Sequence, residues 1–495
     1  MVIVYNKCIR YLLIRPSLQR SEKMPNINEQ LDKAFSPKVV AVIGARRADD
    51  YVWLKNMTDF KGKVYSVQVA DSDIEGIVEM GIENYKSIGE IPEDVDYAVF
   101  AVPRRFAASV LRDAVDKKIP TVHMFTSGYA ESGEEQAIKD QDEIQQIATE
   151  SGTLIIGPNC MGVFNPEVGM RFGPGQDVEN IGNVSIISQS GAHASSMTAA
   201  IQGNGIGINR TISFGNGIVL DSPDLLNYFG NDPKTKLICG YIEGPKNGRR
   251  FFEELRKVTP IKPVVLWKGG QTDAGVRSVA SHTGSLAGSV EVWNAMVQQA
   301  GAIRADSLEE ALDASKALLY LTPTTGENMG IIGGSGGQSV SMSDDFSRAG
   351  LNVPRLTEST LESMSEFFQL VGASYFNPLD VGGMNRGNIE NIISLLGNDP
   401  NIDILALMVG AQAARRRSID DTLEQLELYA KVRDETGKPL LGIFWTPTPY
   451  KDSEVILELD KAMQDLGIPS FPNPERAAKA VSKVVKYHRF KQAVT

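Results

Sequence analysis

Short runs of apolar, mostly β-branched residues recur along the chain from residue 39 onward. Each run ends in a glycine or another small residue and is followed by a longer stretch with helical patterning, the order typical of parallel β-sheets covered by helices. The runs are continuously apolar rather than alternating, as expected of strands buried on both faces. The pattern therefore predicts an α/β fold built from doubly wound parallel sheets.

Two turn-rich segments, 163–176 and 321–328, divide the apolar runs into three groups. We therefore predict an N-terminal extension followed by three doubly wound domains, at residues 1–23, 24–170, 176–322 and 327–495. The predicted strands are 39–45, 64–69, 97–102, 121–128 and 153–157 in the first domain, 183–191, 210–215, 237–244 and 263–270 in the second, and 329–337, 404–410 and 439–445 in the third.

One helix of the second domain has a clear pattern of its own. Val292, Met296 and Ala300 recur at helical spacing and Gly301 follows, which predicts a helix with these three residues on its apolar face. Function in such domains concentrates at the carboxyl ends of the strands, where turns lead into helices. The candidate motifs fall at these turns.

Composition narrows the class of protein. Of the 495 residues 42% are apolar and 22% are charged, the balance of an ordinary globular protein. No apolar segment reaches the roughly 20 residues that span a membrane. The net charge of −11 argues against a general attraction to nucleic acid or anionic lipid, so we expect neither as a partner.

Cysteine and histidine are scarce. Cys8, Cys160 and Cys239 are too few and too scattered for a disulfide framework or a zinc site, which favours a reducing cytoplasm. Four histidines exclude an imidazole-rich cluster, so we expect no metal site. The basic residues 1–23 fit either a targeting segment or sequence upstream of a start at Met24.

The first strand ends in the segment VVAVIGARR, where Gly44 would let a backbone approach a phosphate at a following helix N-terminus. A tight strand-to-helix turn explains the same residues, and Arg46 could be a phosphate contact or a surface charge. No GxGxxG follows, which argues against a nicotinamide-dependent dehydrogenase.

Two further strands end in loops of serine and glycine, SIISQSGAHASS (185–196) and GIIGGSGGQSVS (330–341). Each loop would point unpaired N–H groups and the positive end of a helix at one spot, and two such ends could hold a phosphoryl group between them. Either loop alone could also be an ordinary turn. Neither has the form of a P-loop.

His282 lies in VRSVASHTGSLAG, a small-residue segment without hydrophobic period that we interpret as a loop. Neutral imidazole is a competent nucleophile toward phosphorus, although a lone histidine is more often structural. Glu243, at the end of a strand of the same domain, could fix the tautomer of the imidazole. We expect His123 to be packed in a strand, whereas His193 follows the first serine loop and lacks independent support.

Taken together, these segments resemble the ADP-forming acyl-CoA synthetases, relatives of succinyl-CoA synthetase, from about residue 33 to the end. VAVIGA, VPRR, TSGYAE and GPNCMG are similar to the Rossmann-like CoA-binding domain, and SQSGA and YIEG to a flavodoxin-like domain. KGGQTDAGVRSVASHTGSLAG resembles the segment that holds a phosphorylated histidine. GGSGG and FNPLDVGG resemble a second flavodoxin-like, ligase-type domain.

The resemblance implies roles for individual residues. It implies that His282 is the phosphohistidine and that Glu243 supports it. The residues it implies for holding the phosphoryl group are Ser190, Gly191, Ala192, Gly336 and Gly337. The residues it implies for binding CoA are Gly44, Ala45, Arg46, Pro103, Asn159 and Cys160.

The implied enzyme is an acid–thiol ligase of the alpha type, which converts acyl-CoA and phosphate into an acyl phosphate and CoA and passes the phosphoryl group through His282 to ADP. Three sheets leave no segment for an ATP-grasp domain, so ATP, ADP and Mg are expected on a separate ATP-grasp beta-type subunit of a hetero-oligomer. Arg46 replaces a serine usual in the family, which leaves open a CoA-binding or regulatory protein of the same fold without turnover. The sequence does not identify the carboxylic acid.

Overall fold

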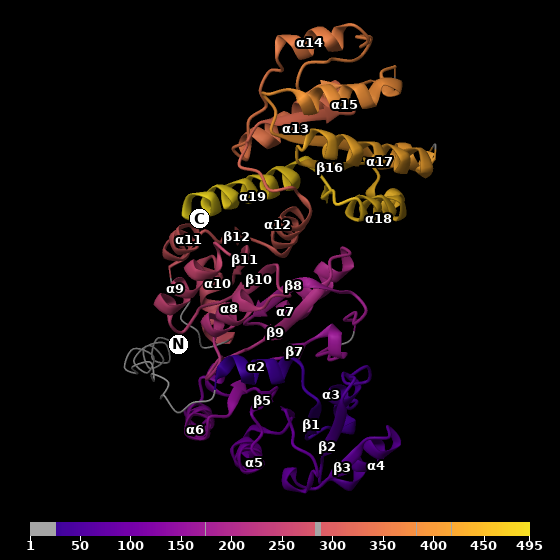
Figure 1. Ribbon diagram of the computed structural model, residues 1–495. Helices are drawn as coiled ribbons and strands as arrows, with labels where there is room; N and C mark the ends of the chain where they lie inside the picture. Colours follow the sequence, from indigo (N-terminus) through magenta and orange to yellow (C-terminus); the bar gives the residue numbers. More distant parts are fainter. Residues whose placement is uncertain (1–25, 174, 283–288, 383, 417) are drawn as a thin grey trace. The chain divides into compact units, whose positions relative to one another are not determined.

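The computed structural model describes residues 26–173, 175–282, 289–382, 384–416 and 418–495. These residues form three β-sheets with flanking helices, which confirms the predicted α/β class (Figure 1). The chain divides into two compact units, one up to Asp306 and one from Ser307. The first unit holds two sheets and the second unit holds one.

The first sheet contains six parallel strands, which are β1 (Val39–Ile43), β2 (Lys63–Val67), β3 (Glu83–Tyr85), β4 (Tyr97–Phe100), β5 (Thr121–Met124) and β6 (Leu154–Ile156). Their order, β3-β2-β1-β4-β5-β6, places β1 and β4 at the centre. All five residues of β1 are buried, as its continuous apolar run predicts. The five predicted strands are confirmed with shorter bounds, and β3, which has no buried residue, was missed.

Helices and short 3₁₀-helices connect these strands. They are η1 (Arg47–Asp49), α3 (Val52–Lys55), α4 (Asp71–Glu79), η2 (Ile88–Glu90), α5 (Arg104–Asp116), η3 (Ala130–Ser132) and α6 (Glu135–Ser151). α5 and α6 pack against each other. Their buried faces, with Ala107, Leu111 and Ala148 among them, belong to the core that the strands share.

The second sheet contains β7 (Gly162–Phe164), β8 (Ile181–Ser188), β9 (Ile208–Ser213), β10 (Leu237–Ile242), β11 (Val264–Lys268) and β12 (Ile303–Ala305). Its order is β12-β11-β10-β8-β9-β7. All pairs are parallel except β7 with β9. The linker interpretation of residues 163–176 is therefore wrong at its start, because an apolar tripeptide there pairs with the edge of this sheet.

The helices of the second sheet are α7 (Gly191–Gly203), α8 (Ser222–Asn231), α9 (Gly248–Val258), α10 (Asp273–His282) and α11 (Val290–Gln299), and a 3₁₀-helix, η4 (Pro166–Val168), follows β7. The predicted helix before Gly301 is confirmed as α11, but its predicted apolar face is confirmed at Ala300 and wrong at Val292. Trp293, Val297 and Ala300 are buried, whereas the side chain of Val292 is 68% exposed. The buried stripe is displaced because the large Trp293 ring stacks on Phe251 of α9.

A helix ahead of the first strand, α2 (Ile27–Phe35), contacts both sheets of the first unit. It packs against β5 on one side and against β7 and α8 on the other. Its fully buried Phe35 stacks on Tyr228, whose hydroxyl donates to Asp32 over 2.6 Å. The guanidinium of Arg210 in turn donates to the Tyr228 hydroxyl. This helix therefore holds the two sheets together.

The second unit contains one parallel sheet of β13 (Met329–Gly333), β14 (Leu379–Asp380), β15 (Ile404–Gly410), β16 (Leu440–Trp445) and β17 (Ser470–Phe471), in the order β14-β13-β15-β16-β17. Its helices are α12 (Leu308–Tyr320), α13 (Gly336–Arg348), α14 (Glu358–Ser365), α15 (Ile389–Asn398), α16 (Ala411–Arg416), α17 (Ile419–Thr436), α18 (Pro449–Asp465) and α19 (Pro474–Val494), with η5 (Arg386–Asn388). The three predicted strands are confirmed.

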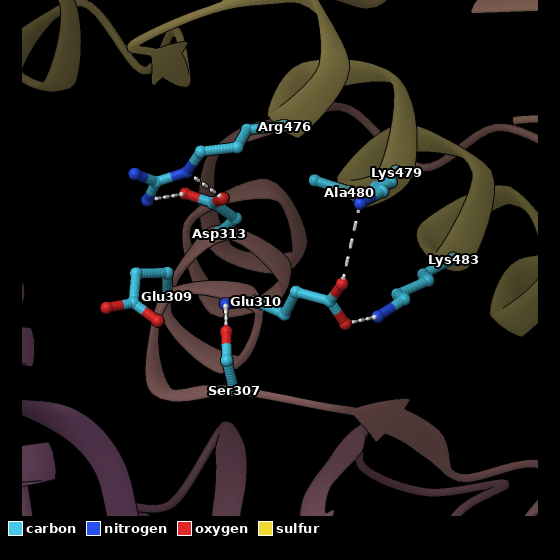
Figure 2. Close-up of a pocket in the computed structure, with 8 residues that line it drawn as sticks. All are labelled: Ser307, Glu309, Glu310, Asp313, Arg476, Lys479, Ala480 and Lys483. Carbon is cyan, nitrogen blue, oxygen red and sulfur yellow. Dashed lines mark hydrogen bonds and ion pairs between the residues drawn. The ribbon is translucent and has the colours of Figure 1, made fainter. Parts of the chain in front are cut away.

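α12 packs against α19 of the second unit rather than ending the domain before it. Residues of the two helices line a pocket of about 190 Å³. Figure 2 shows the ion pairs that join the helices there. Arg476 donates through Nε and Nη2 to the carboxylate of Asp313 over 2.6 and 2.8 Å. Lys483 donates to Glu310 over 2.6 Å. The division between the two compact units thus falls ahead of α12. The boundaries predicted for the three domains stay a prediction.

Candidate functional site

The first candidate residue, Gly44, follows β1 at the carboxyl edge of the first sheet. Its φ is +88°, and a Cβ atom there would lie 2.8 Å from Cγ1 of Val102 and 3.0 Å from the carbonyl oxygen of Ala101. Only glycine fits this turn without strain. Ala45 beside it is buried, and its carbonyl oxygen accepts a hydrogen bond from Gln68. The turn is therefore tightly packed between β1, β2 and β4.

The segment after Gly44 differs from the predicted strand–turn–helix. The three-residue η1 follows the turn, and the next α-helix, α3, has only four residues. The exposed side chain of Arg46 pairs with Asp49 over 3.1 Å, and Arg47 pairs with Glu75 over 3.3 Å. A short 3₁₀ turn offers little helix dipole, so an anion at this turn would depend on side chains.

Pro103 caps the N-terminus of α5, at the same edge of the sheet. The exposed Phe106 lies in the first turn of this helix, with the guanidinium of Arg105 4.7 Å from its ring centre. Val69 and Phe125, which follow β2 and β5, are also exposed, at 66% and 41%. Sequence reasoning missed these four residues. Their signal is an apolar or basic side chain just after a strand or in the first turn of the helix that follows it.

Asn159 and Cys160 lie in the loop between β6 and β7. Asn159 adopts a φ of +58°, and its backbone N–H donates to Thr126 over 3.0 Å. Cys160 is 4% exposed, with its Sγ 3.7 Å from the carbonyl oxygen of Met124. Burial raises the pKa of the Cys160 thiol far above its usual range. The thiol is therefore buried and unreactive, so any contact of Cys160 with a ligand would come from its backbone.

The serine loop after β8 leads into α7 at the carboxyl edge of the second sheet. Ser190 caps this helix of 13 residues, with its side chain accepting from the N–H of His193 over 3.4 Å. Gly191 and Ala192 form the first turn, and Ala192 is exposed. A helix of this length presents free N–H groups and a partial positive charge at its N-terminus. The predicted anion-holding geometry is present at this loop.

Glu243 lies beside that loop, after the neighbouring strand β10. The residue is 4% exposed, and its carboxylate accepts from the hydroxyl of Tyr241 over 3.3 Å. Burial raises the pKa of Tyr241, with the Glu243 carboxylate adding to the effect. The rings of His193 and Trp267 lie 4.1 and 4.9 Å from the Tyr241 ring. The carboxylate thus lies at the edge of an aromatic cluster, which sequence reasoning missed.

Two further buried polar side chains, Gln189 and Lys268, bind the backbone of Glu243 and Gly244, which we call the Glu243 turn. Gln189 accepts from the N–H of Glu243 over 2.8 Å, and Lys268 donates to the carbonyl oxygen of Glu243 over 2.5 Å. Burial lowers the pKa of Lys268 to about 8, partly opposed by Glu243. The sequence contained a signal for both residues, because each lies in a quoted motif, Gln189 in SQSGA directly before Ser190 and Lys268 at the start of KGGQTDAGVRSVASHTGSLAG.

α10 begins at this same edge, after β11 and the pair Gly269 and Gly270. A Cβ atom on Gly269 would lie 2.5 Å from the Tyr241 hydroxyl oxygen and 2.9 Å from Cγ of Glu243, so no side chain fits there. The helix packs against η3, in the first sheet's part of the unit. The loop interpretation is therefore wrong as far as His282, since residues 273–282 are helical, with Val279 buried.

His282 is the last residue of α10. Its side chain and residues 283–288 lie outside the part of the chain that the structure describes. Of the other histidines, His123 is buried as predicted, and its Nε2 lies 3.0 Å from the carbonyl oxygen of Cys160. Burial lowers the pKa of His123 to about 4, so it is neutral at physiological pH. His193 is placed at the candidate site by its contact with Tyr241.

The second serine and glycine loop lies in the second unit. Ser335 precedes α13, and Gly336 and Gly337 form the exposed first turn of this 13-residue helix, after β13. Asp380, at the end of the neighbouring β14, has a carboxylate oxygen 3.4 Å from the Cβ position of Gly336. The loop has the predicted local geometry. That it holds a phosphoryl group together with the Ser190 loop stays a prediction.

Two kinds of feature are absent from the described residues. None of the helices that the structure describes combines the length and apolar character needed to cross a membrane. Within the same residues, no three His, Cys, Asp or Glu side chains are grouped so that they could hold a metal ion.

Comparison with known proteins matches two family models, which cover most of the first unit and extend into α12 of the second. Residues 38–166 match a CoA binding domain, and residues 181–318 match a succinyl-CoA ligase like flavodoxin domain. The first range contains β1 to β6, and the second contains the Ser190 loop, Glu243 and α10.

Several relatives are similar over most of this chain. Subunit alpha of the ADP-forming acetate–CoA ligase II of Pyrococcus furiosus is 34% identical over 92% of this chain and 97% of its own length. The ADP-forming acetate–CoA ligase I of Archaeoglobus fulgidus is 31% identical over 93% of this chain and 64% of its own length. The dinucleotide forming acetyl-coenzyme A synthetase 1 of Ca. Korarchaeum cryptofilum, solved with phosphate and ADP, has a TM-score of 0.77 and 30% identity over 94% of this chain and 98% of that one.

Proposed function

Because this chain belongs to the family of ADP-forming acyl-CoA ligases, as an alpha-type subunit, we propose that it binds CoA at the carboxyl edge of its first sheet and accepts a phosphoryl group on His282. Glu243 is the supporting carboxylate in this proposal. The convergence of the Ser190 loop, Glu243 and the start of α10 at one edge of the second sheet carries the proposal.

The first sheet supports the CoA part of the proposal. Gly44, Ala45, Arg46 and Pro103 line its carboxyl edge, and Asn159 with the backbone of Cys160 follows β6 there. The exposed Arg105 and Phe106 add a cation and an aromatic face, which suit the phosphates and the adenine of CoA. Because η1 is short, we assign the phosphate contacts to arginine side chains rather than to a helix N-terminus.

The second sheet supports the phosphoryl part. Phosphate attacks the carbonyl carbon of an acyl-CoA, so that an acyl phosphate forms and the CoA thiolate leaves. The unprotonated nitrogen of His282 then attacks phosphorus, and the carboxylate of the acid leaves. The carboxylate of Glu243 accepts a hydrogen bond from the N–H of the imidazole and stabilises the cation that forms. The N–H groups of the Ser190 loop, and in our proposal those of Gly336 and Gly337, neutralise the phosphoryl oxygens.

The phosphoryl group then passes to ADP on another polypeptide. We propose an ATP-grasp beta-type subunit that binds ADP and Mg, in a hetero-oligomer located in the cytoplasm. The alpha-subunit names of two relatives and the buried thiols of Cys160 and Cys239 support this part of the proposal. Several relatives are named for acetate, so a small carboxylic acid is the proposed acyl donor.

Labelling with γ-³²P-ATP tests the nucleophile. The full chain is mixed with an ATP-grasp partner, and we expect label on this chain that is lost in acid and retained in base. His282→Ala should abolish the label. His193→Ala is the matched control, because His193 is the other histidine at this edge and contacts Tyr241. Full label in His282→Ala together with loss in His193→Ala would refute the assignment.

A panel of acids tests the activity as a whole. Acetate, a branched short-chain acid, an aryl acid and a long-chain acid are each supplied with CoA, ATP and the partner, and acyl-CoA formation is measured. We expect turnover with at least one short acid and a higher KM for CoA in Arg105→Ala. Tight CoA binding without turnover on any acid would instead indicate a binding protein.

A further inference from the structure

The two residues of the Glu243 turn are held by side chains from both neighbouring strands. β10 lies between β8 and β11, and Gln189 follows β8 while Lys268 ends β11. Oε1 of Gln189 accepts from the N–H groups of Glu243 and Gly244 over 2.8 and 3.0 Å, and its Nε2 donates to the carbonyl oxygen of Gly244 over 3.2 Å. Nζ of Lys268 donates to the carbonyl oxygen of Glu243. All four backbone polar groups of the turn are therefore bound by two side chains.

We propose that Gln189 and Lys268 are positioning residues that fix the Glu243 carboxylate relative to the Ser190 loop. The inference rests on the proposed role of Glu243 in supporting His282. A carboxylate on an untethered turn could rotate away from an imidazole, and small displacements of a reacting group reduce rates strongly. Gln189 directly precedes Ser190, so one residue joins the anion-holding loop to the carboxylate turn.

Burial makes these hydrogen bonds matter. Gln189 and Lys268 are each 3% exposed, so water cannot replace a bond that is lost. Lys268 also donates to the carbonyl oxygen of Gly269 over 2.5 Å, at the turn that leads into α10. A single ammonium thus ties the Glu243 turn to the start of the helix that ends at His282. A residue needed only to fill space would not require a buried charge, which is costly in a protein interior.

The test compares phosphorylation rates in the full chain with an ATP-grasp partner that labels the wild-type chain. Gln189→Met keeps the volume and loses the three hydrogen bonds to the Glu243 turn, whereas Gln189→Glu keeps the two that Gln189 accepts there and loses the one that it donates there. We expect a single-turnover phosphorylation rate at least tenfold lower in Gln189→Met, an intermediate rate in Gln189→Glu, and a rate at least tenfold lower in Lys268→Met. The Kd for CoA should stay within twofold of the wild type, since these residues lie on the second sheet.

A double variant separates this inference from the proposed function. If Gln189 acts through Glu243, then Gln189→Met combined with Glu243→Gln should be no slower than Glu243→Gln alone. A wild-type rate in Glu243→Gln would overturn the role of Glu243 and this inference with it. A slow Glu243→Gln combined with a wild-type rate in Gln189→Met, or with multiplied effects in the double variant, would overturn this inference and leave the proposed function standing. Rates are measured well below each variant's Tm, so that unfolding does not contribute.

Discussion

The ion pair between Arg476 and Asp313 should decide how firmly α12 is attached to α19 within the second unit. The Asp313 side chain is 8% exposed and the Arg476 side chain 33% exposed. Arg476→Met would leave the buried carboxylate without its two donors. Breaking a buried pair costs roughly 3–5 kcal/mol, and the partial exposure of Arg476 favours the lower end. A cost of about 3 kcal/mol corresponds to a hundredfold change in the equilibrium constant for opening.

Amide hydrogen exchange measured on peptides of α12 is the appropriate assay, because a chain with two compact units need not unfold in one step. We expect exchange roughly a hundredfold faster in Arg476→Met. Adding Asp313→Asn should restore most of the protection, since no buried charge is left unpaired. Lys431→Met is the control, because its pairs with Glu390 and Glu435 are exposed, lie outside α12 and α19, and are worth under about 1 kcal/mol each. A change below threefold in Arg476→Met would refute the reasoning.

Three further predictions concern the first unit. N-ethylmaleimide should leave Cys160 and Cys239 unlabelled in the native chain and label both in urea, because both thiols are buried; fast native labelling would contradict this. Gly269→Ala should slow phosphorylation at least tenfold and lower the Tm, since its Cβ would lie 2.5 Å from the Tyr241 hydroxyl oxygen; an unchanged rate would show that the turn can shift. Burial lowers the pKa of Lys268 from 10.5 in the unfolded chain to about 8 in the folded one. Between pH 8 and 10.5 the unfolded state therefore binds more protons, and the contribution of Lys268 to the free energy of unfolding rises with pH. Urea titrations from pH 7 to 10 should show that contribution in the wild type and not in Lys268→Met, and identical pH profiles would count against it.

Much of the fold could be predicted because buried parallel strands leave a strong signal. The run of β1 is apolar at every position, and it became the centre of its sheet. β3 gave no such signal, since its residues ENY lie at an edge and are partly exposed. β7 was hidden because its partner, β9, is distant in sequence and its own three residues precede a turn-rich segment.

The sequence pointed to the glycines, the serine and the carboxylate of the candidate site. It did not point to the side chains that hold them in place. Glu243 directly follows β10 and Ser190 lies two residues after β8, so the end of each strand located them. The pairing of Gln189 with the Glu243 turn depends on the order of β8, β10 and β11 in the sheet, which the sequence does not reveal. The α10 helix was missed because its many small residues give no hydrophobic period. The burial of Val279 on this helix is visible only in the packed structure.

The position of α2 has a practical consequence for anyone dividing this chain into pieces. The matched CoA-binding region begins at residue 38, after α2 has ended. A fragment cut at that boundary would uncover Tyr228 and Phe229, against which Phe35 packs, and leave the Arg210 guanidinium without one aromatic face. The first unit should therefore be expressed from before Asn26, and a fusion partner should be attached upstream of the helix rather than between it and β1.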